Sequence, residues 1–187
     1  MQGEYSPCFG IMNFFKHLKT VGWHRRAVRK LCFKVGLIRQ GLTHDLSKYS
    51  RAEFRPGVKY YQGFRSPQAR EREVLGYSAA WLHHKGRNKH HFEYWMDFAD
   101  GKKVYIEMPA KYFAEMVCDR VAACKIYLKD KYTNSSPLEY MEAHMDKESI
   151  NKNTYEQLKY FLTMLKDEGE KKTFIALKNY VKESKKK

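Results

Sequence analysis

A long helix is predicted over residues 109–130, where apolar side chains recur three and four positions apart. The residues that follow this spacing are Tyr112, Phe113, Met116, Val117, Val121, Cys124 and Leu128. Pro109 suits the first turn of such a helix, because its fixed φ and missing amide hydrogen cost nothing there. The pattern is typical of a helix that turns one face towards a core.

Similar spacing indicates helices in several other stretches. These are residues 11–38, 68–84, 137–146, 153–167 and 170–184. Gly36 is expected to end the first, and Gly169 separates the last two, which predicts a helical hairpin. The 187 residues include only five prolines and eleven glycines, too few for a β fold with many turns. We therefore predict an all-α chain, with a helical domain over residues 1–136 and a C-terminal helical extension, residues 137–187, packed on it.

Two shorter segments carry local predictions. A helix is expected to begin near Thr43, a suitable N-cap, and to run through the HDLSKYS segment at residues 44–50. The DGKK segment, with the apolar residues that follow it up to residue 106, fits either a hairpin or an irregular loop.

The charge of the chain points to anionic partners. Its 36 Lys and Arg against 21 Asp and Glu give a net charge of +15, and eight basic residues without an acidic one lie between Lys16 and Arg39. This balance favours a phosphorylated substrate, nucleic acid or a membrane surface as partner, although solubility alone also explains it. No apolar run approaches the roughly 18 residues of a membrane span. Of the three partners, we expect the phosphorylated substrate, with nucleic acid possible, and no membrane.

The cysteines indicate the redox state of the compartment in which the protein is found. The four cysteines form no CxxC pair and are too few for a disulfide scaffold; they are Cys8, Cys32, Cys118 and Cys124. A reduced, cytoplasmic protein is the expectation.

Histidines are concentrated in the first half of the chain. Seven of the eight precede residue 92, and four of them form the doublets His83-His84 and His90-His91. His44 is followed directly by Asp45, and His17 and His24 are seven apart on one predicted helix face. Neutral imidazole suits divalent transition metals, and a carboxylate can join or bridge them. A single histidine is usually structural, but this combination predicts a metal site.

These motifs resemble the HD-domain superfamily, which is named for an adjacent His-Asp pair and includes metal-dependent phosphohydrolases. The resemblance lies in an early helical histidine, His24, the HDLSK segment, the histidine doublets and a late helical aspartate, Asp119 in EMVCDRVAA. The chain is also similar to a family of small uncharacterised bacterial proteins that carry HDLSK and two histidine doublets. The resemblance implies a helical bundle of the HD type.

The resemblance also implies a set of metal ligands. The first set is His24, His44, Asp45 and Asp119, with His17 as an alternative to His24 and with Asp45 as the bridging carboxylate if two metals bind. One member of each doublet completes a second site, for which we take His84 and His90, with His83 and His91 as alternates. One or two divalent ions are expected, and Mn, Fe, Zn and Ni are all compatible with these ligands.

The predicted chemistry is hydrolysis of a phosphate ester. A metal pair activates water near neutral pH. Asp45, as the carboxylate between the two ions, would be a catalytic residue. Lys48, one helical turn past His44, would bind a phosphate oxygen, unless it is a solvated lysine. Arg25 and Arg29 beside His24 would bind an anionic substrate, or only cover a solvent face.

The function expected from these residues is a metal-dependent phosphohydrolase that acts on a small phosphorylated compound or nucleotide. Two alternatives stay open. One is a nucleic-acid-binding helical protein with a structural metal, which the basic segment favours, and the other is a di-iron oxygenase of the HD type. Glu115, four residues before Asp119, is either an outer-shell acid or a partner of Lys111.

Overall fold

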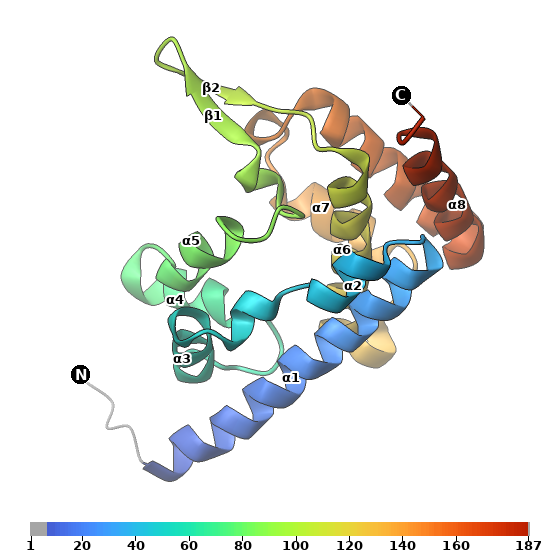
Figure 1. Ribbon diagram of the computed structural model, residues 1–187. Coiled ribbons are helices and arrows are strands. Elements are labelled where there is room, and N and C mark those ends of the chain that lie inside the picture. The colour runs from blue at the N-terminus through green and yellow to red at the C-terminus, as the bar shows by residue number, and fades with distance from the viewer. Residues whose placement is uncertain (1–6, 187) are drawn as a thin grey trace.

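A computed structural model describes residues 7–186 of the chain, with side chains from residue 11 onward. The described part is predominantly helical, which confirms the all-α prediction, and it contains one short two-stranded sheet. Figure 1 shows the helices around a common centre, with the hairpin projecting from one end. Among the described residues, no helix is long and apolar enough to cross a membrane. The side chain of Cys8 lies outside the described residues.

Three long helices build the core: α1 (Pro7–Lys34), α6 (Ala110–Leu128) and α8 (Lys152–Glu183). Their fully buried residues include Val28 on α1, Phe113 and Val117 on α6, and Leu162 on α8. The helix predicted over residues 109–130 is thus confirmed, and it packs against both of the others. The buried apolar cluster includes residues from both sides of the predicted division at residue 137, and that division stays a prediction.

The last long helix is interrupted as the sequence indicated. Gly169 has φ +81° and ψ 170°, a conformation that is strained for residues with a side chain, and the helical path breaks there. Leu158 and Leu165 before the break and Leu177 after it are fully buried. The shorter helix α7 (Ser136–His144) packs between this segment and α6.

Glu170, directly after the break, is the acceptor in a three-helix ion-pair network. Lys34 on α1 donates to it at 2.6 Å, and Lys125 on α6 donates to its other carboxylate oxygen. Burial raises the pKa of Glu170, but the two lysines lower it by more, so the net shift is downward. The network therefore stabilises the fold above the ordinary pKa of a glutamate, and this stabilisation is lost as the pH falls through the lowered pKa.

Glu170→Gln is expected to lower the free energy of unfolding by about 1 kcal/mol at neutral pH, because the pairs are partly exposed. Denaturant unfolding of both proteins at pH 7 and near pH 3 tests this. The difference between them should shrink at the lower pH, and Glu168→Gln, on an exposed neighbour, should have little effect. A difference that is the same at both pH values would contradict the assignment.

The segment around His44 departs from the predicted helix. Helix α2 (Ile38–Thr43) ends before His44, Asp45 has φ +53°, and a short 3-10 turn, η1 (Leu46–Tyr49), follows. The prediction of one helix through HDLSKYS is therefore wrong. Aspartate tolerates the left-handed conformation better than most residues, and the reversal leaves both His44 and Asp45 buried. Helix α3 (Arg51–Lys59) begins after Ser50.

Two helices stand where one was predicted over residues 68–84. Helix α4 (Pro67–Leu75) ends at Gly76, which has φ +78°. Helix α5 (Ala79–Lys85) begins after Ser78, whose side chain accepts a hydrogen bond from the amide of Trp81. The break gives α5 a direction of its own, and the last turn of α5 carries His83 and His84.

The DGKK segment forms a hairpin, one of the two structures that the sequence left open. After a 3-10 turn, η2 (Phe92–Tyr94), strand β1 (Met96–Ala99) pairs antiparallel with β2 (Lys102–Tyr105). Asp100 and Gly101 both have positive φ, which a two-residue turn of this hand requires. Two further 3-10 turns, η3 (Lys129–Lys131) and η4 (Lys147–Ser149), flank α7.

Candidate metal centre

Five separate segments bring histidines and aspartates to one place. His24 comes from α1, His44 and Asp45 from the turn after α2, and Asp119 from α6. His84 is on α5, and His90 and His91 lie in the loop that follows. All but Asp119 and His91, which are half-buried, are buried. Residues far apart in sequence therefore converge on one cluster of side chains that could hold a metal ion, and its groups are called the metal-binding groups below.

The first group joins His24, His44, Asp45 and Asp119. One ligand atom from each lies within 4.8 Å of the others, a spacing at which they could hold one ion. Nε2 of His24 is 2.9 Å from Oδ1 of Asp119. Nε2 of His44 is 3.4 Å from Oδ2 of Asp45 and 3.5 Å from Oδ1 of Asp119.

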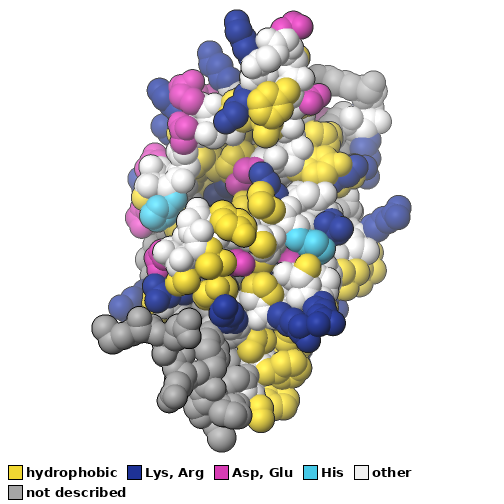
Figure 2. Space-filling model, turned by 90° about the vertical axis from the view of Figure 1, so that its left-hand side faces the viewer, with side chains coloured by type: hydrophobic (Ala, Val, Ile, Leu, Met, Phe, Trp, Pro, Cys, Tyr) yellow, Lys and Arg dark blue, Asp and Glu magenta, His cyan; other side chains and the backbone are white. Residues whose placement is uncertain are grey.

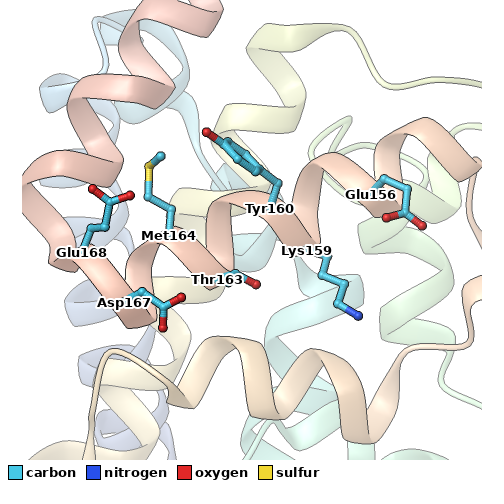
Figure 3. Close-up of a pocket in the computed structure, with 7 residues that line it drawn as sticks. All are labelled: Glu156, Lys159, Tyr160, Thr163, Met164, Asp167 and Glu168. Atoms are coloured by element: carbon cyan, nitrogen blue, oxygen red, sulfur yellow. The ribbon is translucent and has the colours of Figure 1, made fainter.

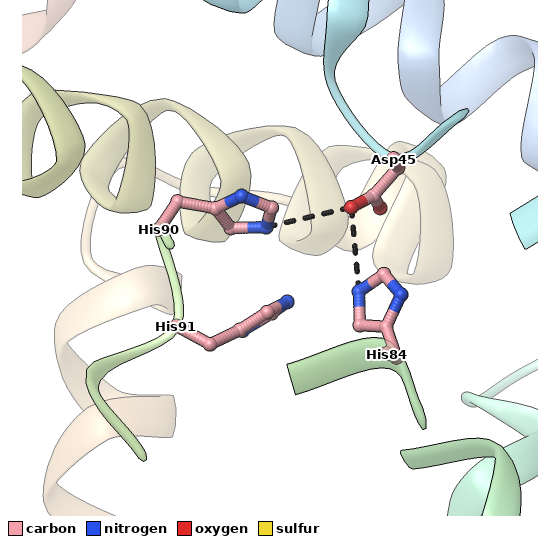
Figure 4. A group of neighbouring side chains, drawn as sticks. All are labelled: Asp45, His84, His90 and His91. Atoms are coloured by element: carbon pink, nitrogen blue, oxygen red, sulfur yellow. Dashed lines mark ion pairs between the residues drawn. The ribbon is translucent and has the colours of Figure 1, made fainter. Parts of the chain in front are cut away.

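The second group joins Asp45, His84, His90 and His91 (Figure 4). Oδ1 of Asp45 is 3.3 Å from Nε2 of His84 and 3.5 Å from Nε2 of His90, and His91 points into the same space. The Asp45 side chain is only 1% exposed. Because its Oδ2 faces the first group and its Oδ1 the second, this carboxylate belongs to both.

Three buried atoms of the second group make no hydrogen bond: Asp45 Oδ1, His90 Nε2 and His91 Nε2. Asp45 Oδ1 and His90 Nε2 have only the ion-pair contacts given above. Buried polar atoms are usually satisfied, so three such atoms in one group require an explanation. A divalent cation bound by imidazole nitrogens and a carboxylate oxygen would satisfy all of them. The residues present thus fit a metal ion.

Two buried glutamates orient the histidine rings. Glu115 Oε1 is 2.9 Å from Nδ1 of His44 and 3.3 Å from Nδ1 of His90. Glu53 accepts from Nδ1 of His84 and of His83, both at 2.7 Å. With Nδ1 held by a carboxylate, the Nε2 atoms of His44, His84 and His90 are left to face Asp45, as in carboxylate–histidine–metal arrangements. Glu115 thus contacts two histidines of the cluster, and with His44 and His90 it also forms a third group that could hold a metal ion.

The electrostatics of the cluster favour a bound cation. Burial lowers the pKa of His44, but Asp45, Asp119 and Glu115 outweigh it and raise that pKa to about 10. Burial raises the pKa of Asp45, but His44, Lys48 and His84 hold it well below its usual range. The carboxylates are therefore ionised at neutral pH and attract positive charge, whether protons or metal ions.

Lys48 reaches the centre from the 3-10 turn rather than from a helix. Its Nζ is 2.8 Å from Oδ2 of Asp45, and its side chain is 26% exposed, towards a cavity. Burial lowers the pKa of Lys48, but Asp45 and Asp119 outweigh it and raise that pKa, which keeps the ammonium charged. Lys48 thus places a fixed positive charge between Asp45 and the cavity.

Other residues singled out in the sequence have different surroundings. His17 packs its ring against Phe54 and Tyr61, next to Gly57, and among the described residues it belongs to neither group. Burial and the charge of Lys48 lower the pKa of His17 to about 4. His83 pairs with Glu53, outside both groups, whereas the alternate His91 joins the second group.

Arg25 and Arg29 do not line the cavity. The Arg25 guanidinium donates to the carbonyl oxygens of His44, at 2.8 Å, and Leu42, at 3.2 Å, and so holds the turn that precedes Asp45. Arg29 is exposed. The substrate contacts predicted for these two arginines stay predictions, and the geometry adds a positioning role for Arg25.

A cavity of about 810 Å³ opens beside the metal-binding groups. His24, His84, His91 and Asp119 line it on the side of the centre. The rest of its wall includes basic, acidic and aromatic side chains, among them Lys48, Arg65, Arg72, Lys85, Lys103, Arg120, Glu53, Glu71, Glu93, Asp146, Trp81, Phe92 and Tyr140. No sequence pattern predicts this set, because its members come from several helices and from the loops that connect them. On the face shown in Figure 2, hydrophobic, basic and acidic side chains are interspersed, with histidines among them.

A second hollow, of about 390 Å³, runs along α8 (Figure 3). Its wall comes from that helix alone, at residues 156–168, and carries no histidine or cysteine. It is separate from the metal-binding groups.

The comparisons with known proteins yield one match. A family model described as "Family of unknown function (DUF5662)" matches residues 13–164, which include both metal-binding groups. No curated protein and no solved structure matches the chain.

Proposed function

The chain belongs to the DUF5662 family of unknown function, and we propose that it is a metal-dependent phosphohydrolase of the HD type. Its substrate would be a small phosphorylated compound or a nucleotide. The observation that carries the proposal is Asp45, one buried carboxylate shared by two groups of side chains that could each hold a metal ion, beside a large cavity that Lys48 also lines. An adjacent His-Asp pair completed by a late helical aspartate also supports the resemblance to the HD superfamily.

The chain's own residues suit phosphate chemistry. His24, His44, Asp45 and Asp119 would hold one ion, and Asp45, His84, His90 and His91 a second. Bound there, divalent ions supply a Lewis acid for a phosphoryl oxygen and lower the pKa of water. Lys48 neutralises negative charge on a phosphoryl group in the cavity. Glu53 and Glu115 keep the rings in place.

Lys48→Met is expected to reduce the rate of phosphate release about 100-fold, because it removes a fixed charge near the reacting group. Lys48 belongs to neither metal-binding group, so metal content should be retained. Steady-state phosphate release and elemental analysis of the same samples test this, and Lys48→Arg should recover part of the rate. Full activity of Lys48→Met would show that the charge of Lys48 plays no part in the reaction.

The function itself is tested by loading the protein with Mn, Fe, Zn or Ni and measuring phosphate release from a panel of phosphate esters and nucleotides. Release by the wild type that is absent in Asp45→Asn would support the proposal. Metal-loaded protein that releases no phosphate from the panel would contradict it. Oxygen uptake by the iron-loaded protein would favour a di-iron oxygenase instead.

Nucleic acid binding is a second candidate function, favoured by the outer face of α1. The exposed side chains of this helix include Lys16, Lys19, Arg26, Arg29 and Lys30, without an acidic residue. Such a face would bind phosphates without reading sequence. Binding to generic DNA that weakens steeply with salt and survives His44→Ala would support it.

A further inference from the structure

Three cations of the cavity wall surround one carboxyl group. Arg72, Lys85 and Arg120 are the basic residues whose charges act on Glu93, and all four line the cavity. Arg72 comes from α4, Lys85 from the end of α5, Glu93 from η2 and Arg120 from α6. Their convergence depends on tertiary structure alone.

Within the described part of the chain, none of these three cations forms an ion pair with a carboxylate, although Arg72 contacts the ring of Trp81. Nε of Arg120 and Oε2 of Glu93 are buried, and neither makes a hydrogen bond. By contrast, Arg65, at another part of the same wall, is paired with Glu73. Lys85 and Arg120 are partly buried, whereas Arg72 is exposed. A partly buried cation without a partner is costly unless an anion compensates it.

The local charge balance favours an anion. With Glu93 ionised, the four residues together carry a charge of about +2, or about +1 when Asp119, whose charge also acts on Arg120, is included. A guanidinium offers a planar fork of donors that matches an oxyanion. Arg120 directly follows Asp119, so this wall adjoins the metal-binding groups. Arg72 also lies over the ring of Trp81, 5.5 Å from its centroid, which places an aromatic surface beside the cations.

We propose that Arg72, Lys85 and Arg120 form a second anion subsite, so that the substrate carries an oxyanion, phosphate or carboxylate, besides the phosphoryl group at the metal centre. This inference rests on the proposed function for the identity of the first group. It narrows the substrate class to phosphate esters with a second negative group. Lys48 and the metal centre would bind one end of such a molecule, and Arg120 the other.

Non-hydrolysable phosphonates test the subsite by calorimetry on metal-loaded protein. Alkylphosphonates are compared with ω-carboxyalkylphosphonates of matched chain length, from one to four methylene groups. For at least one length, the added carboxylate should tighten binding to the wild type about tenfold or more. Arg120→Gln should abolish this gain while leaving the affinity for the alkylphosphonate unchanged, and Arg120→Lys should retain part of it. The exposed Arg55, which does not line the cavity, provides the control Arg55→Gln.

If no length shows a gain, or if the gain survives Arg120→Gln, the subsite is refuted. Should Arg120→Gln fail to fold, Lys85→Gln, at the end of α5, takes its place. If alkylphosphonates do not bind at all, the proposed function fails, and the subsite is then tested alone in Asp45→Asn. Inorganic phosphate should raise the melting temperature of that variant, and Arg120→Gln should remove the effect; no shift would refute the subsite.

Discussion

Asp45→Asn is expected to empty both metal positions at once. Wild-type protein should carry about two equivalents of a transition metal, since two groups of ligands share Asp45. The substitution keeps the size of the side chain but removes the charge that faces His44 and Lys48 on one side and His84 and His90 on the other. An amide offers only one weak ligand atom, so neither group keeps its bridging carboxylate.

Single-group variants make this prediction specific. Asp119→Asn touches only the first group and His91→Gln only the second, so each should lose about one equivalent. Elemental analysis of proteins purified without chelator gives the count, and Asp130→Asn, at an exposed carboxylate, should match the wild type. If Asp45→Asn keeps one equivalent, the two groups do not share a carboxylate.

Glu115→Ala is expected to weaken metal binding about 10–100-fold without removing a proposed ligand of the shared centre. Glu115 Oε1 is within 3.3 Å of Nδ1 of both His44 and His90, so its loss frees two rings, one in each group. Two buried Nδ1–H groups would also lose their acceptor, which is expected to cost about 3 kcal/mol of folding free energy.

Metal titration followed by thermal unfolding separates the two effects of Glu115→Ala. Glu142→Ala, at an exposed position on α7, is the matched control. Glu115→Gln should be milder, because its amide oxygen can still accept one of the hydrogen bonds. Unchanged affinity in a correctly folded Glu115→Ala would mean that the rings are held by packing alone.

The sequence and the fold contribute different parts of this centre. His24, His44, Asp45, the doublets and Asp119 could be found from residue type and order, because clustered histidines are uncommon in a helical chain. The orienting contacts could not. Glu53 bonds a histidine 31 residues away and Glu115 one 71 residues away, and a glutamate on a helix looks the same in sequence whatever it contacts.

Backbone geometry was the second limit on prediction. The helical pattern runs through HDLSKYS, but the burial of His44 and Asp45 requires a left-handed residue that local propensity does not indicate. The long helices were easier to predict, because the seven apolar positions of α6 recur at helical spacing and fit no other regular structure. Arg120 is a further example. Its neighbour Asp119 could be recognised as a candidate ligand from the sequence, but the residues around Arg120 come from α4, α5 and η2 and could not be predicted.

A crystal structure with anomalous diffraction data, collected at the absorption edge of the metal found by elemental analysis, tests the dinuclear centre most directly. We predict two anomalous peaks, with one oxygen of Asp45 about 2.0–2.2 Å from each, one peak beside His24 and Asp119 and the other beside His84 and His90. A map without a peak at Asp45, from protein soaked in that metal, would contradict the metal centre and the hydrolase proposal that depends on it.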